Sequence, residues 1–234
     1  MATRKTLWRW LKRILAVLFV LLLCYQTWFA AHVWWWVDHN PATSSFMENR
    51  LETLQSKNPR AALQHKWLPY AQISDNLKRA LIAAEDAKFV DHEGFDWDGI
   101  ALAYEKNKQQ GKIVAGGSTI SQQLAKNLFL STKRTPWRKA EEAAITVMLE
   151  IIMDKQRIFE IYLNVIEWGN GIFGAEAAAQ HYFGISAAQL SPEQAARLAA
   201  MVPSPRYYDR HRDAPGLMNK TAIILGNMQY AEIP

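Results

Sequence analysis

The sequence predicts a mostly α protein, in which one N-terminal transmembrane helix precedes a helical domain. Two observations support this fold class. Residues 14–36 contain no Asp, Glu, Lys or Arg, and this run satisfies the roughly 20 apolar residues that a helix needs to cross a bilayer. From Ser74 onward, apolar residues recur at helical spacing between capping residues, whereas patterns typical of strands are scarce.

The apolar run 14–36 is typical of an uncleaved membrane anchor. Five basic residues precede it and indicate that segment 1–13 stays in the cytoplasm, and tryptophans flank both ends, as in interfacial belts. A cleaved signal peptide is the alternative, but its apolar region would be about 7–15 residues long and followed by a small-x-small site. Trp28 and Phe29 stand two residues before Ala30 and Ala31, so neither alanine completes such a site. We therefore expect the remainder of the chain to lie outside the cytoplasmic membrane.

Charge and cysteine content narrow the function classes. The formal net charge is +5, and the five basic residues before Ile14 account for the whole excess, so no basic field indicates a nucleic-acid partner. The only cysteine, Cys24, lies in the apolar run, so the exported part depends on packing rather than on disulfides. We assign residues 37–66 to a linker and membrane-proximal segment, and 67–234 to one domain.

The helices of the domain are predicted from caps and stop signals. In chain order they span residues 75–84, 96–110, 120–130, 136–153, 155–164, 175–183, 192–202 and 217–230. Asp75 can cap the first of them, whose apolar face follows directly. Asp96 or Asp98 can begin the second, and Gly111 ends it, because glycine adopts the left-handed conformation that closes a helix.

Stronger signals mark the later helices. Segments 119–122 and 191–194 have the Ser/Thr-x-x-Gln pattern of a capping box. Pro136 suits the first turn of a helix, because its missing N–H loses no intrahelical bond there. Asp154 can cap the next helix, and Gly184 closes a short alanine-rich helix.

The segment 85–96 gathers charged side chains directly behind a predicted buried helix. Glu85 follows an apolar wall, and partial burial raises the pKa of a carboxylate toward the range that a general base needs. Asp86 must point to another side of the helix, so we expect it to hold a neighbouring group. The alternative is a helix end that frays into a solvated acidic loop, and this segment alone does not decide between the two.

Two further segments favour an anion. Gly116 and Gly117 lead into a capped helix, whose free N–H groups and positive dipole end suit a phosphate, and Lys126 adds a charge one turn later. Arg138 and Lys139 oppose the dipole at the start of their helix, which an anion nearby would offset. An ordinary loop–helix junction and a surface ion pair to a glutamate four residues after Arg138 are the alternatives. Metal-ligand patterns such as His-Glu-x-x-His or a zinc-spaced Cys/His cluster are absent from the sequence.

Five motifs, in order and spacing, resemble those of one known family. The first reads Glu85-Asp86-x-x-Phe89-x-x-His92-x-Gly94-x-Asp96 and the second Gly117-Ser118-Thr119-Ile120-Ser121-Gln122-Gln123-Leu124-x-Lys126-Asn127. The other three lie in residues 138–150, 155–164 and 198–205. The resemblance is to the family 51 glycosyltransferases, the peptidoglycan glycosyltransferases of bacterial cell walls. It extends from about Trp67 to about Tyr230.

The resemblance implies a lysozyme-like, α-rich glycosyltransferase domain that polymerises lipid II into β-1,4-linked glycan strands. The reaction would invert the MurNAc anomeric carbon and release undecaprenyl pyrophosphate. Because the chain ends at Pro234, we expect a monofunctional member without transpeptidase activity. The expected partners are lipid II, the growing glycan chain, the membrane, and other cell-wall synthesis and division proteins. The expected location is the inner membrane, with the N-terminus inside and the catalytic domain in the periplasm.

Site residues are implied by the same motifs. Glu85 would be the catalytic base, and Glu142 the second acidic residue, which orients cations or shares a divalent cation (Mg²⁺ or Mn²⁺) with the pyrophosphate. No other cofactor is expected. Substrate and pyrophosphate would be bound by Lys88, Ser118, Thr119, Gln122, Gln123, Lys126, Arg138 and Lys139. Structural support of the site would come from Asp86, Phe89, His92, Gly94, Asp96 and Asn164.

Two other function classes remain open at the level of the sequence. A lytic, lysozyme-like hydrolase or transglycosylase would also use a glutamate, but its leaving group is a sugar and needs no set of cations. A non-catalytic, membrane-anchored scaffold predicts that Glu85→Gln affects no activity.

Overall fold

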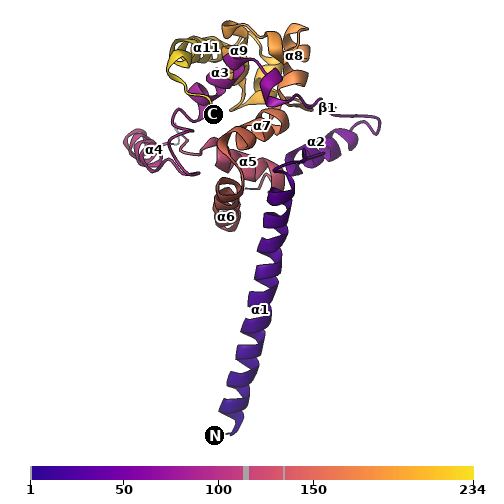
Figure 1. Cartoon of the computed structure of the whole chain (residues 1–234), viewed down its shortest axis with the longest axis vertical. Helices are drawn as coiled ribbons and strands as arrows, with labels where there is room; N and C mark the ends of the chain where they lie inside the picture. Colours follow the sequence, from indigo (N-terminus) through magenta and orange to yellow (C-terminus); the bar gives the residue numbers. More distant parts are fainter. Residues whose placement is uncertain (1, 113–115, 134) are drawn as a thin grey trace.

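A computed structural model describes residues 2–112, 116–133 and 135–234 of the chain. One long helix, α1, projects from a helical domain (Figure 1). The helices are α1 (Ala2–Trp35), α2 (Ser45–Gln55), α3 (Asp75–Glu85), α4 (Trp97–Gln110), α5 (Ile120–Phe129), α6 (Pro136–Ile152), α7 (Lys155–Val165), α8 (Ala175–Phe183), α9 (Pro192–Met201), α10 (Pro205–Arg210) and α11 (Pro215–Asn227). Short 3-10 turns span Tyr70–Gln72, Ala187–Gln189 and Met228–Tyr230. The prediction of a mostly α fold is confirmed.

Helix α1 has the dimensions of a membrane span. The window Thr6–Trp35 is long and apolar enough to cross a bilayer, and little of it is buried against the domain. The helix begins at Ala2, so residues 2–13 belong to the same helix as the apolar run.

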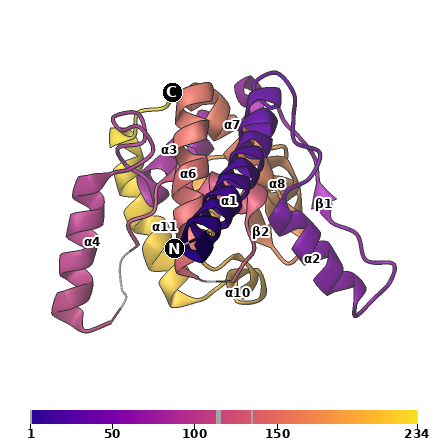
Figure 2. The same ribbon diagram turned by 90° about the horizontal axis from the view of Figure 1, so that it is seen from below.

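The C-terminal part of α1 packs against the domain. Phe29 and Val33 are buried, and the ring centroid of Phe29 lies 5.1 Å from that of Phe129 in α5. The Tyr25 hydroxyl donates a hydrogen bond of 2.6 Å to Glu141 in α6. In the view from the end at which α1 projects, helices α4 and α2 lie on opposite sides of α1 and α6 (Figure 2). Helix α1 therefore contacts α5 and α6 directly.

The segment 37–66, assigned to a linker, contains the helix α2 and one strand. Ser44 caps α2 by accepting a hydrogen bond from the Met47 N–H, and the Met47 side chain is buried. The loop-forming residues around Pro41 concealed this cap in the sequence. Arg50 of α2 forms an ion pair of 2.6 Å with Glu167, which fastens the helix to the domain.

A three-stranded sheet, absent from the prediction, has the order β1-β3-β2. Strand β1 (Gln64–His65) pairs in parallel with β3 (Ile172–Phe173), and β2 (Glu167–Gly169) pairs with β3 in antiparallel register. The strands have only two or three residues each, too few for periodicity to reveal them.

The core surrounds α7, which lies between the α5–α6 pair and the helices at the far end of the domain (Figure 1). Seven of the eight residues of α7 from Ile158 to Val165 are buried. Helix α3 packs with α9 and α11, and α5 packs with α6 and α7. The site helices α3, α5 and α6 are thereby held by one continuous core.

Most helix limits agree with the caps seen in the sequence. Asp96 caps α4 by accepting from the Gly99 N–H at 2.9 Å, and Gly111 ends it with a φ of 62°. Ser74 rather than Asp75 caps α3. Helix α10 is absent from the prediction, because a six-residue helix that begins at Pro205 gives no periodic signal.

Candidate active site

Glu85 is the last residue of α3, and its carboxylate is oriented by two side chains of other helices. The Gln123 amide of α5 donates a hydrogen bond of 2.7 Å to Glu85 Oε2. The Tyr162 hydroxyl of α7 donates to Gln123 Oε1 at 3.1 Å, and Tyr162 is fully buried. This bond holds the carbonyl of Gln123 toward Tyr162 and its amino group toward Glu85.

The environment of Glu85 suits a general base. Burial raises the pKa of its carboxyl above the ordinary value, and the Asp86 charge acts in the same direction. The hydrogen bond from Gln123 and the charges of Lys126 and Lys220 oppose this rise. The result is a carboxylate whose pKa is shifted toward neutrality in reach of a cationic neighbour.

Asp86 and His92 connect this helix end to the start of α5. His92 Nε2 lies 2.9 Å from Asp86 Oδ1, and Asp86 Oδ2 accepts a hydrogen bond of 2.9 Å from the Ile120 N–H. A carboxylate is favourable at this point, because the first N–H groups of α5 are otherwise unpaired. Asp86 therefore fixes the distance between Glu85 and α5.

Phe89 and Gly94 shape the loop that follows. Phe89 is fully buried, and its ring centroid lies 5.5 Å from that of Phe159. Gly94 has a φ of 87°, and a Cβ there would stand 2.8 Å from Thr146 Cγ2. Its carbonyl accepts a hydrogen bond of 2.7 Å from Thr119 Oγ1, the cap of α5. The loop is thus tied to α5 at a second point.

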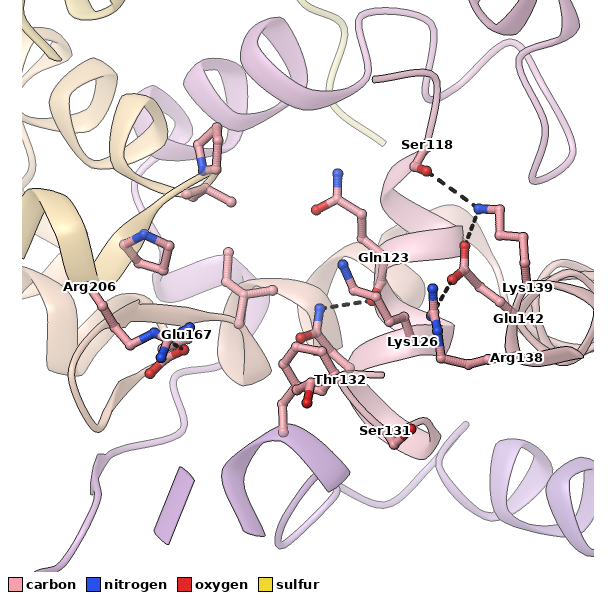
Figure 3. A pocket seen from close by; sticks show the side chains of 16 residues that line it. Ser118, Gln123, Lys126, Ser131, Thr132, Arg138, Lys139, Glu142, Glu167 and Arg206 are labelled. Carbon is pink, nitrogen blue, oxygen red and sulfur yellow. Dashed lines mark hydrogen bonds and ion pairs between the residues drawn. The ribbon is translucent and has the colours of Figure 1, made fainter. Parts of the chain in front are cut away.

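A cavity of about 480 Å³ opens beside Gln123 and contains a group of cations. Its lining includes Ser118, Lys126, Arg138, Lys139 and Glu142. Figure 3 shows Arg138, Lys139 and Glu142 at one end, beside Ser118, with Lys126 between them and Gln123. We call this space the cationic cavity.

Glu142 organises the cations of this cavity. It is buried, and it accepts hydrogen bonds from Arg138 Nη1 at 2.8 Å and from Lys139 Nζ. Lys139 Nζ also lies 3.5 Å from Ser118 Oγ. Burial lowers the pKa of Lys126. The charge of Glu142 opposes this lowering, and the charge of Arg138 adds to it. At this end of the cavity one carboxylate lies among three cations, and with Glu167 and Arg206 the whole lining keeps a net positive charge, as an anionic ligand requires.

Comparisons with known proteins agree with this geometry. The family model described as Transglycosylase matches residues 50–229. The chain belongs to this transglycosylase family. A protein of Methylobacillus flagellatus named biosynthetic peptidoglycan transglycosylase is 68% identical over 95% of this chain and 97% of its own length. One of the same name from Chromobacterium violaceum is 66% identical over 97% and 99%. The resemblance drawn from the five motifs is confirmed, and the chain is an enzyme that transfers glycosyl groups.

Lys88 and Gln122 of this transglycosylase, both predicted to bind substrate, do not line the cationic cavity, and the roles of the predicted site residues stay predictions. Lys88 is exposed, forms an ion pair of 3.2 Å with Asp98, and does not line the cationic cavity. Gln122 is buried, and its Oε1 accepts from the Thr119 N–H in the capping box, so it stabilises the start of α5. Asn164 binds the backbone of Leu68 in both directions and fastens the chain before α3.

The cavity of the transglycosylase is a poor match for a divalent cation held by the protein. Both oxygens of Glu142 are already bound by Arg138 and Lys139. Within residues 2–112, 116–133 and 135–234, no group of three or more His, Cys, Asp or Glu could hold a metal ion. Glu167, the other carboxylate of the lining, is paired with Arg50, so the cavity lacks the free oxygen ligands that Mg²⁺ and Mn²⁺ prefer. We therefore derive no step through a metal.

Sequence analysis assigned Tyr162 of the transglycosylase to the core and missed its contact with the site. A hydroxyl on a helix face that is otherwise apolar needs a partner when buried, and this signal could have revealed it. Lys220 of α11, whose charge reaches Glu85, carried no signal in the sequence. Of the loop that leads to Gly116 and Gly117, residues 113–115 lie outside the described part of the chain.

Proposed function

We propose that this transglycosylase polymerises lipid II into β-1,4-linked peptidoglycan strands, with inversion at the MurNAc anomeric carbon and release of undecaprenyl pyrophosphate. The observation that carries the proposal is the position of Glu85, a carboxylate of raised pKa that is hydrogen-bonded to Gln123 in the lining of the cationic cavity. A base beside a bound anion is the arrangement that attack by a hydroxyl and loss of a pyrophosphate require. The names of the close relatives support the same substrate class.

In the proposed reaction, Glu85 accepts the proton of the 4-hydroxyl of the acceptor GlcNAc. The oxygen forms a bond to the MurNAc anomeric carbon of the growing chain, while the bond from that carbon to the pyrophosphate oxygen breaks. The pyrophosphate leaves with the bonding electrons, and Lys126, Arg138 and Lys139 stabilise its developing charge. The proton then passes from Glu85 to water, which restores the base.

The cationic cavity favours this reaction over a lytic one. A lytic enzyme releases a neutral sugar hydroxyl, for which three cations around one carboxylate would be a cost rather than a benefit. We include no transpeptidase activity in the proposal, because the full-length relatives are named for transglycosylation alone.

Helix α1 supports a location of the catalytic domain at the membrane surface. We propose that α1 crosses the inner membrane with its N-terminus inside and the domain in the periplasm, as its basic N-terminal flank favours. The lipid of the substrate stays in the bilayer, so an anchored enzyme meets it at high local concentration.

The experiment uses purified full-length protein with labelled lipid II. Glu85→Gln removes the base and should lower the polymerisation rate by about 10²- to 10⁴-fold. Glu93→Gln is the matched control, because Glu93 is an exposed carboxylate of the same loop, and its rate should stay within about twofold. Cleavage of preformed glycan without polymerisation would establish the lytic alternative. Polymer formation that Glu85→Gln leaves unchanged would remove Glu85 from the mechanism.

A further inference from the structure

A second cavity of about 690 Å³ continues from the cationic cavity. Pro203, Pro205 and Arg206 line both spaces, so the two adjoin along these residues, and we treat them as one cleft. Figure 3 places Arg206 and Glu167 at the end of the cationic cavity opposite Lys139. We call the second space the basic cavity. It lies between α2, the turn that holds Asn170, and α10.

The basic cavity has an excess of positive charge. Four basic side chains line it: Arg50, Lys57, Arg206 and Arg210. Arg50 is satisfied by Glu167, which also lies 3.7 Å from Arg206 Nε. Among the described residues, Lys57 and Arg210 have no carboxylate within ion-pair distance, and both are exposed to the cavity and solvent.

The one carboxylate in the lining does not neutralise them. Asp209 Oδ1 accepts from the Tyr182 hydroxyl at 3.1 Å and lies 3.3 Å from His181 Nε2. Its Oδ2 accepts a hydrogen bond of 3.2 Å from the Asn170 N–H. Both oxygens are therefore occupied by partners within the fold. An anionic ligand in the cavity would meet Lys57 and Arg210 without displacing an existing ion pair.

The position of the basic cavity beside the cationic cavity indicates which anion binds in it. The cationic cavity alone has the size of a site for one small molecule, so a polymer attached at its pyrophosphate end must continue beyond it. The basic cavity is the described space that prolongs the cleft at the end away from Arg138 and Lys139. Under the proposed function, each disaccharide of the growing strand carries a stem peptide, and a peptide ends in a carboxylate.

We propose that the basic cavity binds the stem-peptide carboxylates of the growing glycan strand as it leaves the cationic cavity, and so keeps the strand on the enzyme between additions. This inference rests on the proposed function and assigns a role to Lys57, Arg206 and Arg210 that the motifs do not contain. Its consequence is specific: the cavity affects strand length and leaves the first coupling of two lipid II molecules unaffected, because no strand yet reaches it.

The test compares strand lengths in vesicles of neutral phosphatidylcholine. Lys57→Gln/Arg210→Gln should shorten the strands about three- to tenfold, as expected for the loss of two exposed ion pairs. The rate of the first coupling should stay within about twofold of the unsubstituted chain. The control variant Arg60→Gln/Lys108→Gln removes two exposed basic residues outside the cavity and should leave strand length unchanged.

A second substrate identifies the ligand. With lipid II whose peptide carboxylates are amidated, the unsubstituted chain should make strands as short as those of the double variant, and the variant should show no further loss. Equal strand lengths for variant and unsubstituted chain on ordinary lipid II would overturn the inference. Shortening that appears only in vesicles with phosphatidylglycerol, and equally with amidated substrate, would assign the cavity to a lipid phosphate and overturn it too.

The outcome also separates this inference from the proposed function. If the unsubstituted chain forms no polymer from lipid II, the proposed function fails. If it forms polymer whose length the double variant does not change, only the role of the basic cavity fails.

Discussion

Two side chains beyond Glu85 determine where its carboxylate lies. The Gln123 amide could point either end toward Glu85, and an amide oxygen there would repel the carboxylate. The buried Tyr162 hydroxyl removes this choice, because it donates to the amide oxygen at 3.1 Å and leaves the amino group to bond Glu85. Tyr162 is fully buried and acts through Gln123, so it is a positioning residue.

Tyr162→Phe should lower kcat about five- to tenfold, the factor expected when one hydrogen bond of about 1 kcal/mol is lost. It should also move the acid limb of the pH–rate profile to higher pH. The Gln123 hydrogen bond lowers the pKa of Glu85, and its loss raises that pKa further. Because the base acts when deprotonated, a higher pKa removes activity from the acid side.

The control for this variant is Tyr182→Phe, which removes another bonded tyrosine hydroxyl outside the path to Glu85. A purely structural role for Tyr162 would lower the melting temperature in both variants and leave the acid limb in place. Steady-state rates across pH, with the melting temperature of each variant, distinguish the two roles.

The alkaline limb should depend on Lys126. Burial lowers the pKa of Lys126, so the cation that stabilises the leaving group is lost at a lower pH than for an exposed lysine. Lys126→Arg keeps the charge at all accessible pH values and should move the alkaline limb upward, with some loss of kcat. Lys88→Arg, outside the cationic cavity, should leave both limbs unchanged. An unmoved limb in Lys126→Arg would assign it to another group.

At the scale of single residues, the sequence predicts those site residues whose chemistry follows from their type and spacing. Glu85, Lys126, Arg138 and Glu142 are of this kind, and the structure brings the last three to one cavity. Tyr162 could not be separated from the core, because its function depends on the distance to a side chain of another helix. Side chains that meet through tertiary packing leave no local pattern in the sequence.

Helices with caps at both ends were predictable, and short elements were not. The capping box of Thr119 and the glycine at 184 fixed their helices to within a residue, since each satisfies backbone groups that a helix end leaves unpaired. Helix α10 and the three-stranded sheet are shorter than the periods on which such predictions depend. Helix α10 and Asn170, in the turn between β2 and β3, nevertheless line the basic cavity.

Gly94 offers a test of how the loop after α3 is built. Gly94→Ala should lower the free energy of unfolding by about 2–4 kcal/mol, because it combines a strained φ with a Cβ 2.8 Å from Thr146 Cγ2. It should also lower activity, since the Gly94 carbonyl binds Thr119 at the start of α5.

The matched variant is Gly111→Ala, which has a similar φ of 62° but no atom within 4 Å of the added Cβ. This variant should lower the free energy of unfolding by only about 1 kcal/mol and leave activity unchanged. Thermal unfolding in detergent, followed by circular dichroism, gives the free energy of unfolding of both variants. Equal losses in the two variants would show that backbone strain alone, and not the contact with α6, makes Gly94 necessary.

At the scale of the whole molecule, the anchor and the site share their supporting helices. Phe29 of α1 packs on Phe129 at the end of α5, the helix that carries Gln123 and Lys126. Tyr25 bonds to α6, the helix that carries Arg138 and Glu142. The orientation of α1 in a bilayer therefore sets the orientation of the cationic cavity relative to the membrane surface.

Arg157 of α7 adds hydrogen bonds between the domain and the residues that directly follow α1. Its guanidinium donates to the Trp36 carbonyl at 2.8 Å, to the His39 carbonyl at 2.7 Å and to Asn40 Oδ1 at 2.9 Å. Hydrogen bonds from a charged group contribute about 1.5–3 kcal/mol each when well formed, enough to hold the end of α1 in one direction. Without them, the chain after Trp36 would let the domain turn relative to α1.

Arg157→Ala should therefore lower the polymerisation rate about three- to tenfold in vesicles, where α1 is fixed by the bilayer. In detergent micelles, which impose no common plane on enzyme and substrate, the rate should stay within about twofold. Arg197→Ala, which removes a surface pair of 3.7 Å with Asp213, controls for the loss of an arginine and should change neither rate. Equal losses in vesicles and micelles would show that Arg157 supports the fold of the domain, and that a fixed angle between anchor and site is not required for catalysis.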